Sequence, residues 1–138
     1  MKRNLSKIKE KTMIPWDLGI IKAIGKQLEQ AIFPSEPPEE MRKTPYLIFE
    51  LKNVAQGQNL TSRAEFEITI VEGKGTTSAS FDILRTINRI IAKELTLSQG
   101  EFVIGSAKAK VDSVESRKNN LVLSMTALLR MKAIYEDE

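Results

Sequence analysis

Residues 62–71 read SRAEFEITIV, and from Arg63 onward polar and apolar side chains alternate without a break. One face of an extended chain here carries four apolar side chains, those of Ala64, Phe66, Ile68 and Ile70. The other face carries Arg63, Glu65, Glu67 and Thr69. Successive side chains of a β-strand point to opposite faces of the sheet, so this period of two is typical of a half-buried strand. We therefore predict a strand over 62–71.

The chain before this strand contains a predicted helix, a connector and a first strand. Apolar residues recur at helical spacing over 20–32, and Asp17 stands where an N-cap is expected, so we predict a helix over 17–32. The helix must end at Pro34, because residues 34–40 read PSEPPEE and proline lacks the amide donor that a helix needs. This acidic connector leads to strand formers at 46–51, YLIFEL, and to a polar loop at 56–59.

The chain after the strand repeats the same order of elements. Gly73 and Gly75 interrupt the strand, and apolar residues at helical spacing predict a second helix over 77–96. A less regular strand is predicted over 102–115, followed by a turn at Lys118-Asn119-Asn120, because asparagine tolerates positive φ. The final strand, predicted over 121–135, alternates again. One of its sides carries Leu121, Leu123, Met125, Ala127, Leu129 and Met131, and the other carries Val122, Ser124, Thr126, Leu128, Arg130 and Lys132.

The order helix, strand, strand therefore occurs twice. It predicts an α+β fold in which a four-stranded, mainly antiparallel sheet carries both helices on one face. A chain of 138 residues with 41% hydrophobic content can close one core but is short for two domains. We expect a basic, flexible N-terminal arm over 1–16 and a single α+β domain over 17–138.

The composition argues against catalysis. The chain has no histidine and no cysteine, so the side chains that most often serve acid–base chemistry, nucleophilic attack and zinc binding are missing. Glu65, Glu67 and Asp112 fall on predicted polar faces, where acids exposed to solvent are expected, although spacing alone leaves a two-carboxylate hydrolase open. The glycine-rich residues 73–77, GKGTT, place the lysine before the second glycine, which is the wrong order for a nucleoside-triphosphate loop. We predict no catalytic residues, no cofactor and no metal site.

The charge of the chain is unevenly distributed. The formal net charge is +3, and the first eleven residues carry five cations against Glu10: Lys2, Arg3, Lys7, Lys9 and Lys11. The remainder is close to neutral, so the sequence indicates a basic arm and no strongly basic folded surface. Such an arm is usually a solvated terminus. Its contact with nucleic acid is the alternative, and a small nucleic-acid-binding module is accordingly the second functional hypothesis.

The sequence also bears on the cellular compartment. A chain without cysteine fits a reducing interior. It shows neither the apolar run of a signal peptide nor the roughly 18 apolar residues of a membrane span. We therefore expect a cytoplasmic protein that does not contact a membrane.

Two features point to assembly with other proteins. The first and last strands carry apolar residues on the face expected to be polar, at Tyr46, Ile48, Val122 and Leu128. These four are candidate contacts with other subunits, unless the N-terminal segment with Met13, Ile14 and Trp16 covers them. A ring whose inner wall carried Arg63, Glu65, Glu67, Arg130 and Lys132 would be mixed in sign, which suits a channel that DNA passes through without sticking.

The layout resembles the tail-completion or tail-terminator proteins of long-tailed phages and prophages. The resemblance covers about residues 17–135 and rests on size, on the order of the elements and on the strand opening PYLIF at 45–49. It implies a homo-oligomeric ring, typically a hexamer, that caps the finished tail tube and offers the surface to which the DNA-filled head joins. The implied partners are further copies of the chain and the tail-tube and head–tail connector proteins, with DNA only in passage and with association with the virion. No individual residue is carried over from the family.

Overall fold

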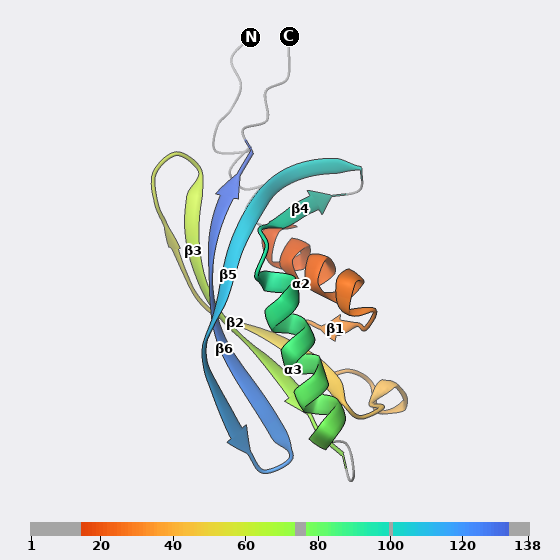
Figure 1. Cartoon of the computed structure of the whole chain (residues 1–138). Coiled ribbons are helices and arrows are strands. Elements are labelled where there is room, and N and C mark those ends of the chain that lie inside the picture. Colours follow the sequence, from red (N-terminus) through yellow and green to blue (C-terminus); the bar gives the residue numbers. More distant parts are fainter. Residues whose placement is uncertain (1–14, 74–76, 100, 133–138) are drawn as a thin grey trace.

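The computed structural model describes residues 15–73, 77–99 and 101–132. In this part of the chain, two α-helices, one 3-10 turn and six strands follow one another (Figure 1). They are α2 (Pro15–Leu28), β1 (Ile32–Phe33), η1 (Glu39–Met41), β2 (Tyr46–Gln56), β3 (Thr61–Val71), α3 (Thr77–Ile91), β4 (Leu95–Gln99), β5 (Phe102–Arg117) and β6 (Asn120–Met131).

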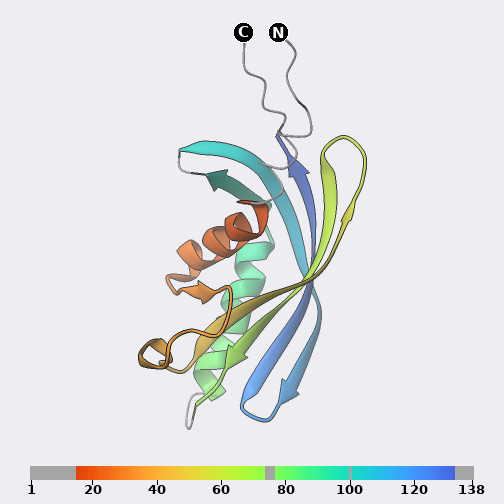
Figure 2. The same ribbon diagram turned by 180° about the vertical axis from the view of Figure 1, so that it is seen from behind.

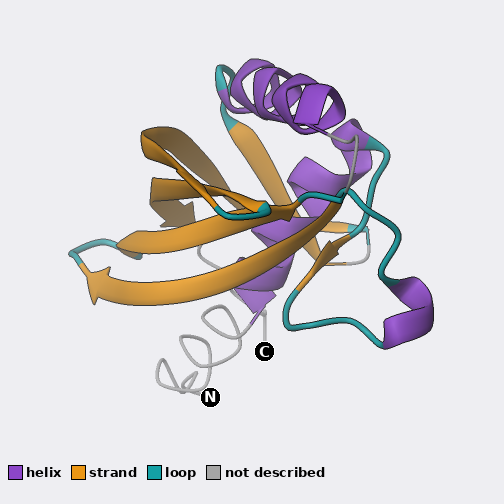
Figure 3. Cartoon of the chain, turned by 90° about the horizontal axis from the view of Figure 1, so that it is seen from below, coloured by secondary structure: helices purple, strands orange, loops and turns teal. Residues whose placement is uncertain are grey.

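All six strands belong to one sheet, in the order β1-β2-β3-β6-β5-β4. β1 runs parallel to β2, and the other four neighbouring pairs are antiparallel. The sheet curls around α2 and α3, which lie on its concave side in Figures 1 and 2. The connector that carries η1 stands away from the sheet in Figures 1 and 3.

The predicted four-stranded, mainly antiparallel sheet with two helices on one face was wrong. The sheet has six strands, because the short strands β1 and β4 extend its two edges. It is mixed, because β1 runs parallel to β2, and it is strongly curled (Figure 1). The predicted first helix included Ile32 of β1, and the predicted second helix included Leu95 and Thr96 of β4; the other residues of these strands were assigned to no element. Strands of two and five residues are too short to show a clear period of two.

Both predicted helices end earlier than expected. α2 spans Pro15–Leu28 and so begins two residues before Asp17, which lies inside its first turn. The helix ends because Glu29 adopts a left-handed conformation, with φ of 59°, and the amide of Gln30 donates to the carbonyl of Gly25 at 3.1 Å. α3 ends at Ile91, four residues before β4 begins.

The core forms between the concave face of the sheet and the two helices. Ile20 and Ile24 of α2 and Ile87 of α3 are completely buried there. The predicted buried face of β3 is confirmed, as is that of β6: every residue assigned to those two faces is buried. α2 packs closely on β4, since a Cβ placed at Gly19 would lie 3.5 Å from the side chain of Leu97.

The two helix-and-strand-pair units meet along the middle of the sheet. β3 pairs with β6 over all of its 11 residues, from the pair Thr61 and Arg130 to the pair Val71 and Asn120. The predicted turn between β5 and β6 is confirmed, because Asn119 has φ of 65°. The hairpins β2–β3 and β5–β6 are therefore joined into one continuous antiparallel centre.

Candidate assembly surface

The face of the sheet that points away from the helices carries most of the predicted channel charges. Glu65 pairs in register with Thr126, Glu67 with Ser124, and Arg130 with both Thr61 and Ser106. These positions, like Arg63 opposite Leu128, alternate with the buried residues of β3 and β6 and so share the helix-free face. Lys132 follows the end of β6, where its backbone amide donates to the carbonyl of Ile104 at 2.7 Å. The structure thus brings four of the five predicted charges onto one face.

Charges in the middle of the helix-free face are paired with opposite charges. The ammonium of Lys52 lies 3.1 Å from a carboxylate oxygen of Glu50 and 3.6 Å from one of Glu67. The hydrogen bond to Glu50 has the largest effect and raises the pKa of Lys52; desolvation opposes it, and the nearby charges of Glu67 and Glu50 raise the pKa further. Across the sheet, Lys110 lies 3.6 Å from Asp112, whose carboxylate accepts a hydrogen bond from the hydroxyl of Thr126. The middle of this face is therefore mixed in sign and largely neutralised.

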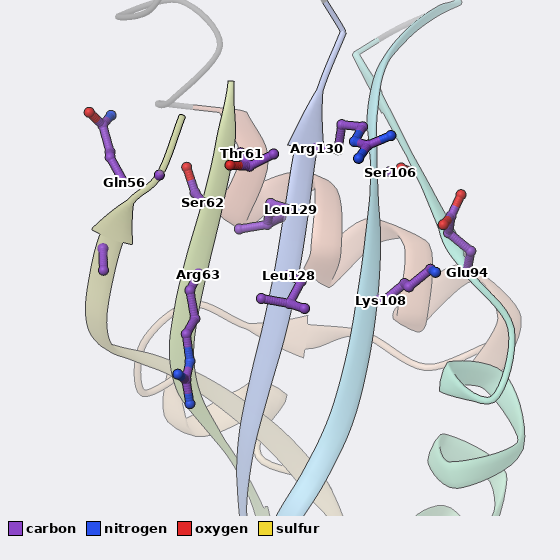
Figure 4. A pocket seen from close by; sticks show the side chains of 12 residues that line it. Gln56, Thr61, Ser62, Arg63, Glu94, Ser106, Lys108, Leu128, Leu129 and Arg130 are labelled. Atoms are coloured by element: carbon purple, nitrogen blue, oxygen red, sulfur yellow. The ribbon is translucent and has the colours of Figure 1, made fainter. Parts of the chain in front are cut away.

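One end of the same face differs, because no ion pair joins its cations to a carboxylate of the described residues. A hollow of about 740 Å³ lies there, and we call it the cationic groove. Arg63 of β3, Arg130 of β6 and Lys108 of β5 line it together with the exposed Leu128, and the side chain of Lys108 points toward Glu94 (Figure 4). Glu94 is the one carboxylate among the described residues that line it. The other lining residues are Ala55, Gln56, Gly57, Thr61, Ser62, Ser106 and Leu129.

The four predicted contact residues have different surroundings. Tyr46 is buried and its hydroxyl donates to a carboxylate oxygen of Glu36 at 2.8 Å, so the acidic connector covers it. Val122 is also buried. It pairs with Thr69, which pairs in turn with Ile48, and the side chain of Ile48 is half-buried. Only Leu128 is fully open to solvent, with 58% of its surface exposed. Of the segment predicted as an alternative cover, Met13 and Ile14 lie outside the described residues, as does the side chain of Trp16.

The side chain of Phe102 is a prominent exposed apolar group that was not predicted from the sequence. Phe102, at the start of β5, is 77% exposed, and its neighbour Val103 is 47% exposed. Both belong to the hairpin of β4 and β5, which reaches the outer rim of the sheet in Figure 1. Because the apolar pattern of 102–115 is irregular, the sequence contained no signal that separated these residues from the core.

Two strand edges are open over part of their length. β1 pairs with β2 only at Leu47 and Ile48, and β4 pairs with β5 only within residues 102–107. In the part of the chain that the structure describes, no strand covers the outer edge of β2 over 49–55 or that of β5 over 108–117. An open edge presents unpaired backbone donors and acceptors, which makes it a natural place for another chain to add a strand.

The described residues contain few features of a metal site, a nucleotide site or a membrane span. Among residues 15–73, 77–99 and 101–132, no group of three or more acidic side chains is arranged to hold a metal ion. Of the glycine-rich stretch, residues 74–76 lie outside the described part, as does the basic arm over 1–14. No helix among the described residues is both long enough and apolar enough to cross a membrane.

Comparison with known proteins adds no assignment. No protein-family model matches the chain, and no curated protein matches its sequence.

Proposed function

We propose that this protein is a structural subunit that assembles head to tail into a closed homo-oligomeric ring, of the kind formed by phage tail-terminator or tail-completion proteins. In that role the ring caps the tail tube and joins it to the head, and the protein becomes part of the virion. The observation that carries the proposal is the pair of open edges on β2 and β5. The resemblance in element order and size supplies the biological setting.

The two open edges lie at the same level of the sheet. In one transverse row Ala55 of β2 is connected through Arg63 and Leu128 to Lys108 of β5. In a second row, which lies five positions away along β3 and β6 and six along β2 and β5, Phe49 is connected through Ile68 and Leu123 to Val114. β2 and β5 are also antiparallel to each other, because three antiparallel steps separate them. The β2 edge of one copy can therefore continue the antiparallel order against the β5 edge of the next.

Such a contact uses two different surfaces of the subunit. Contacts of this heterologous kind generate rings when the rotation between copies closes, and filaments when it does not. Each edge also contains one irregularity in register, between Leu51 and Asn53 in β2 and between Val111 and Ser113 in β5. Bulges restrict which strands can pair with an edge, so these two favour one specific partner over unselective aggregation.

The first test is the mass of the purified protein in solution. Native mass spectrometry at moderate salt, paired with negative-stain images, should show a discrete closed ring, with six copies as the expected number. A protein that stays strictly monomeric at high micromolar concentration contradicts the proposal. Open filaments of variable length contradict the closed ring while supporting the head-to-tail contact.

The second test addresses the edge of β2. Val54→Pro and Ala55→Pro each remove one amide, and successive amides of a strand point to opposite sides. The variant that removes the amide bonded to β3 should lose about 1–3 kcal/mol of unfolding free energy, because the carbonyl that accepted this hydrogen bond is left unpaired. The variant that removes the outward amide should keep the stability of the monomer and lose the oligomer. A stable variant that still forms the full ring means that this edge is not the contact.

A further inference from the structure

We propose that the cationic groove on the helix-free face binds the phosphate backbone of double-stranded DNA. The proposal does not require the ring, since all of its residues belong to one chain. It changes the expected relation to DNA from passage along an inert wall to contact at one end of this face.

The positively charged side chains of the groove are not neutralised by ion pairs with described residues. The side chains of Arg63, Lys108 and Arg130 are exposed, and none of these side chains forms an ion pair or a hydrogen bond with another described residue. Nearer the middle of the face, Lys52 of β2 and Lys110 of β5 are paired with carboxylates. The two halves of the face therefore differ in free charge, and only the groove end keeps cations available for an external anion.

The spacing of the three cations matches the density of phosphates along a DNA duplex. Arg63 and Lys108 flank Leu128 in one transverse row across β3, β6 and β5. Two strand spacings separate the backbones of Arg63 and Lys108 by about 10 Å, and Arg130 lies two residues along β6, at about 7 Å from Leu128. A duplex carries one negative charge for about every 1.7 Å of its axis, so several phosphates fall within reach of these three side chains.

The remaining groups in the groove are also suited to a phosphate backbone. Ser62 and Ser106 line it, and hydroxyl side chains are common donors to phosphate oxygens alongside arginine and lysine. The hydroxyl of Thr61, which also lines it, already donates to the carbonyl of Gln58. The described residues that line the groove include no aromatic side chain. Proteins that bind single strands stack bases on aromatic rings, so the groove fits the backbone of a duplex better than an unpaired strand.

The experiment is a titration of a fluorescent 25-base-pair duplex, followed by anisotropy at 50 and 200 mM salt. The groove variant combines Arg63→Gln, Lys108→Gln and Arg130→Gln. Its matched control combines Lys22→Gln, Arg89→Gln and Lys93→Gln, which removes the same charge from exposed positions on or next to the helices. Melting temperature and solution mass are measured for each protein to establish that it remains folded.

Three phosphate contacts contribute about 2.7 to the slope of log affinity against log salt, which is about a 40-fold loss of affinity between 50 and 200 mM. We expect the affinity of the wild type and of the helix-side control to include this roughly 40-fold loss between the two salt concentrations. The groove variant should lack the contribution of these three contacts to the salt dependence. Equal binding by the groove variant and the control overturns the proposal.

Two further arms separate other sources of binding. A full-length variant with Gln at Lys2, Arg3, Lys7, Lys9 and Lys11 tests the basic arm, and DNA binding that disappears in this variant alone overturns the groove proposal. Poly-L-glutamate tests an acidic polypeptide as the ligand. If it binds more tightly than the duplex, and the groove variant loses that binding, the groove recognises an acidic protein and the DNA proposal is wrong. Tighter binding to single-stranded DNA than to the duplex also overturns it.

Discussion

Leu128 and Leu129 are identical neighbours on β6 with opposite surroundings. Leu129 is 2% exposed and belongs to the core under the helices, whereas Leu128 is 58% exposed in the middle of the cationic groove. The same contrast runs along β3, where Phe66 is buried between the exposed Glu65 and the half-buried Glu67. One strand therefore stabilises the fold through one face and presents charge and an apolar contact through the other.

The largest expected effect comes from truncating these two leucines separately. Leu129→Ala should lower the free energy of unfolding by about 2–5 kcal/mol, because it removes buried methyl groups and leaves a cavity. Leu128→Ala should change it by less than about 0.5 kcal/mol, because its side chain is already in water. Urea unfolding measures both. A destabilisation by Leu128→Ala as large as that of its neighbour means that this side chain is covered in solution, and solution mass then shows whether a second copy covers it.

A smaller effect is expected where two strands approach closely. A Cβ placed at Gly105 of β5 would lie 2.5 Å from the backbone oxygen of Arg130 and 3.0 Å from the Cα of Met131. Gly105→Ala should therefore push β5 and β6 apart and cost about 1–3 kcal/mol. At Gly19 in α2 the nearest atoms, in Leu97, lie 3.5 Å away, which is ordinary contact.

Gly19→Ala is thus the matched control for this substitution. It should stabilise the protein by about 0.5–1 kcal/mol, because alanine restricts the unfolded chain and favours a helix. Thermal unfolding of the two variants gives the comparison. If Gly105→Ala unfolds at the temperature of the wild type, the contact between β5 and β6 is looser than the structure indicates.

The smallest effect is expected on the helix-free face, at Tyr46. Tyr46→Phe removes the hydrogen bond to Glu36, a partly exposed carboxylate, and should cost about 1 kcal/mol near neutral pH. Burial of the phenol, followed by the hydrogen bond to Glu36, raises the pKa of Tyr46 above its ordinary value of 10.0. The protonated phenol is thus the form that the fold favours.

This contribution is fully present below pH 10 and is lost as the pH rises through the raised pKa of the folded state. Urea unfolding at about pH 7 and about pH 11 should show the wild type losing its advantage over Tyr46→Phe at the alkaline value. An advantage that is unchanged between the two values contradicts the connector as the cover of Tyr46.

The accuracy of the sequence predictions follows the length and regularity of each pattern. β3 and β6 were assigned correctly face by face, because 11 and 12 residues give several periods of two. β1 and β4 were missed because they are short: pairing with the neighbouring strand stabilises them, and their own residues show no clear period of two. Arg63 and Arg130, two of the five predicted channel charges, lie on the helix-free face.

Lys108 was absent from the predicted surface, although it completes the groove. It lies on β5 between Ala107 and Ala109, ahead of the irregularity between Val111 and Ser113, so alternation alone places it on the face opposite these alanines. Alternation does not show which strands lie beside β5. The signal that could have identified Lys108 is its opposition to Leu128 across the sheet, and that pairing is visible only once the strand order is known.

The amino-acid sequence by itself determined the local elements of the centre of this protein and the two faces of its longest strands, because hydrophobic periodicity is a property of consecutive residues. It also determined that neither histidine nor cysteine could take part in any site. Only the tertiary structure decided that β3 lies against β6, that β2 and β5 keep open edges at one level, and that three cations from three strands line one groove with Leu128. These features depend on contacts between residues far apart in the chain, and such contacts are selected by the packing of the whole core.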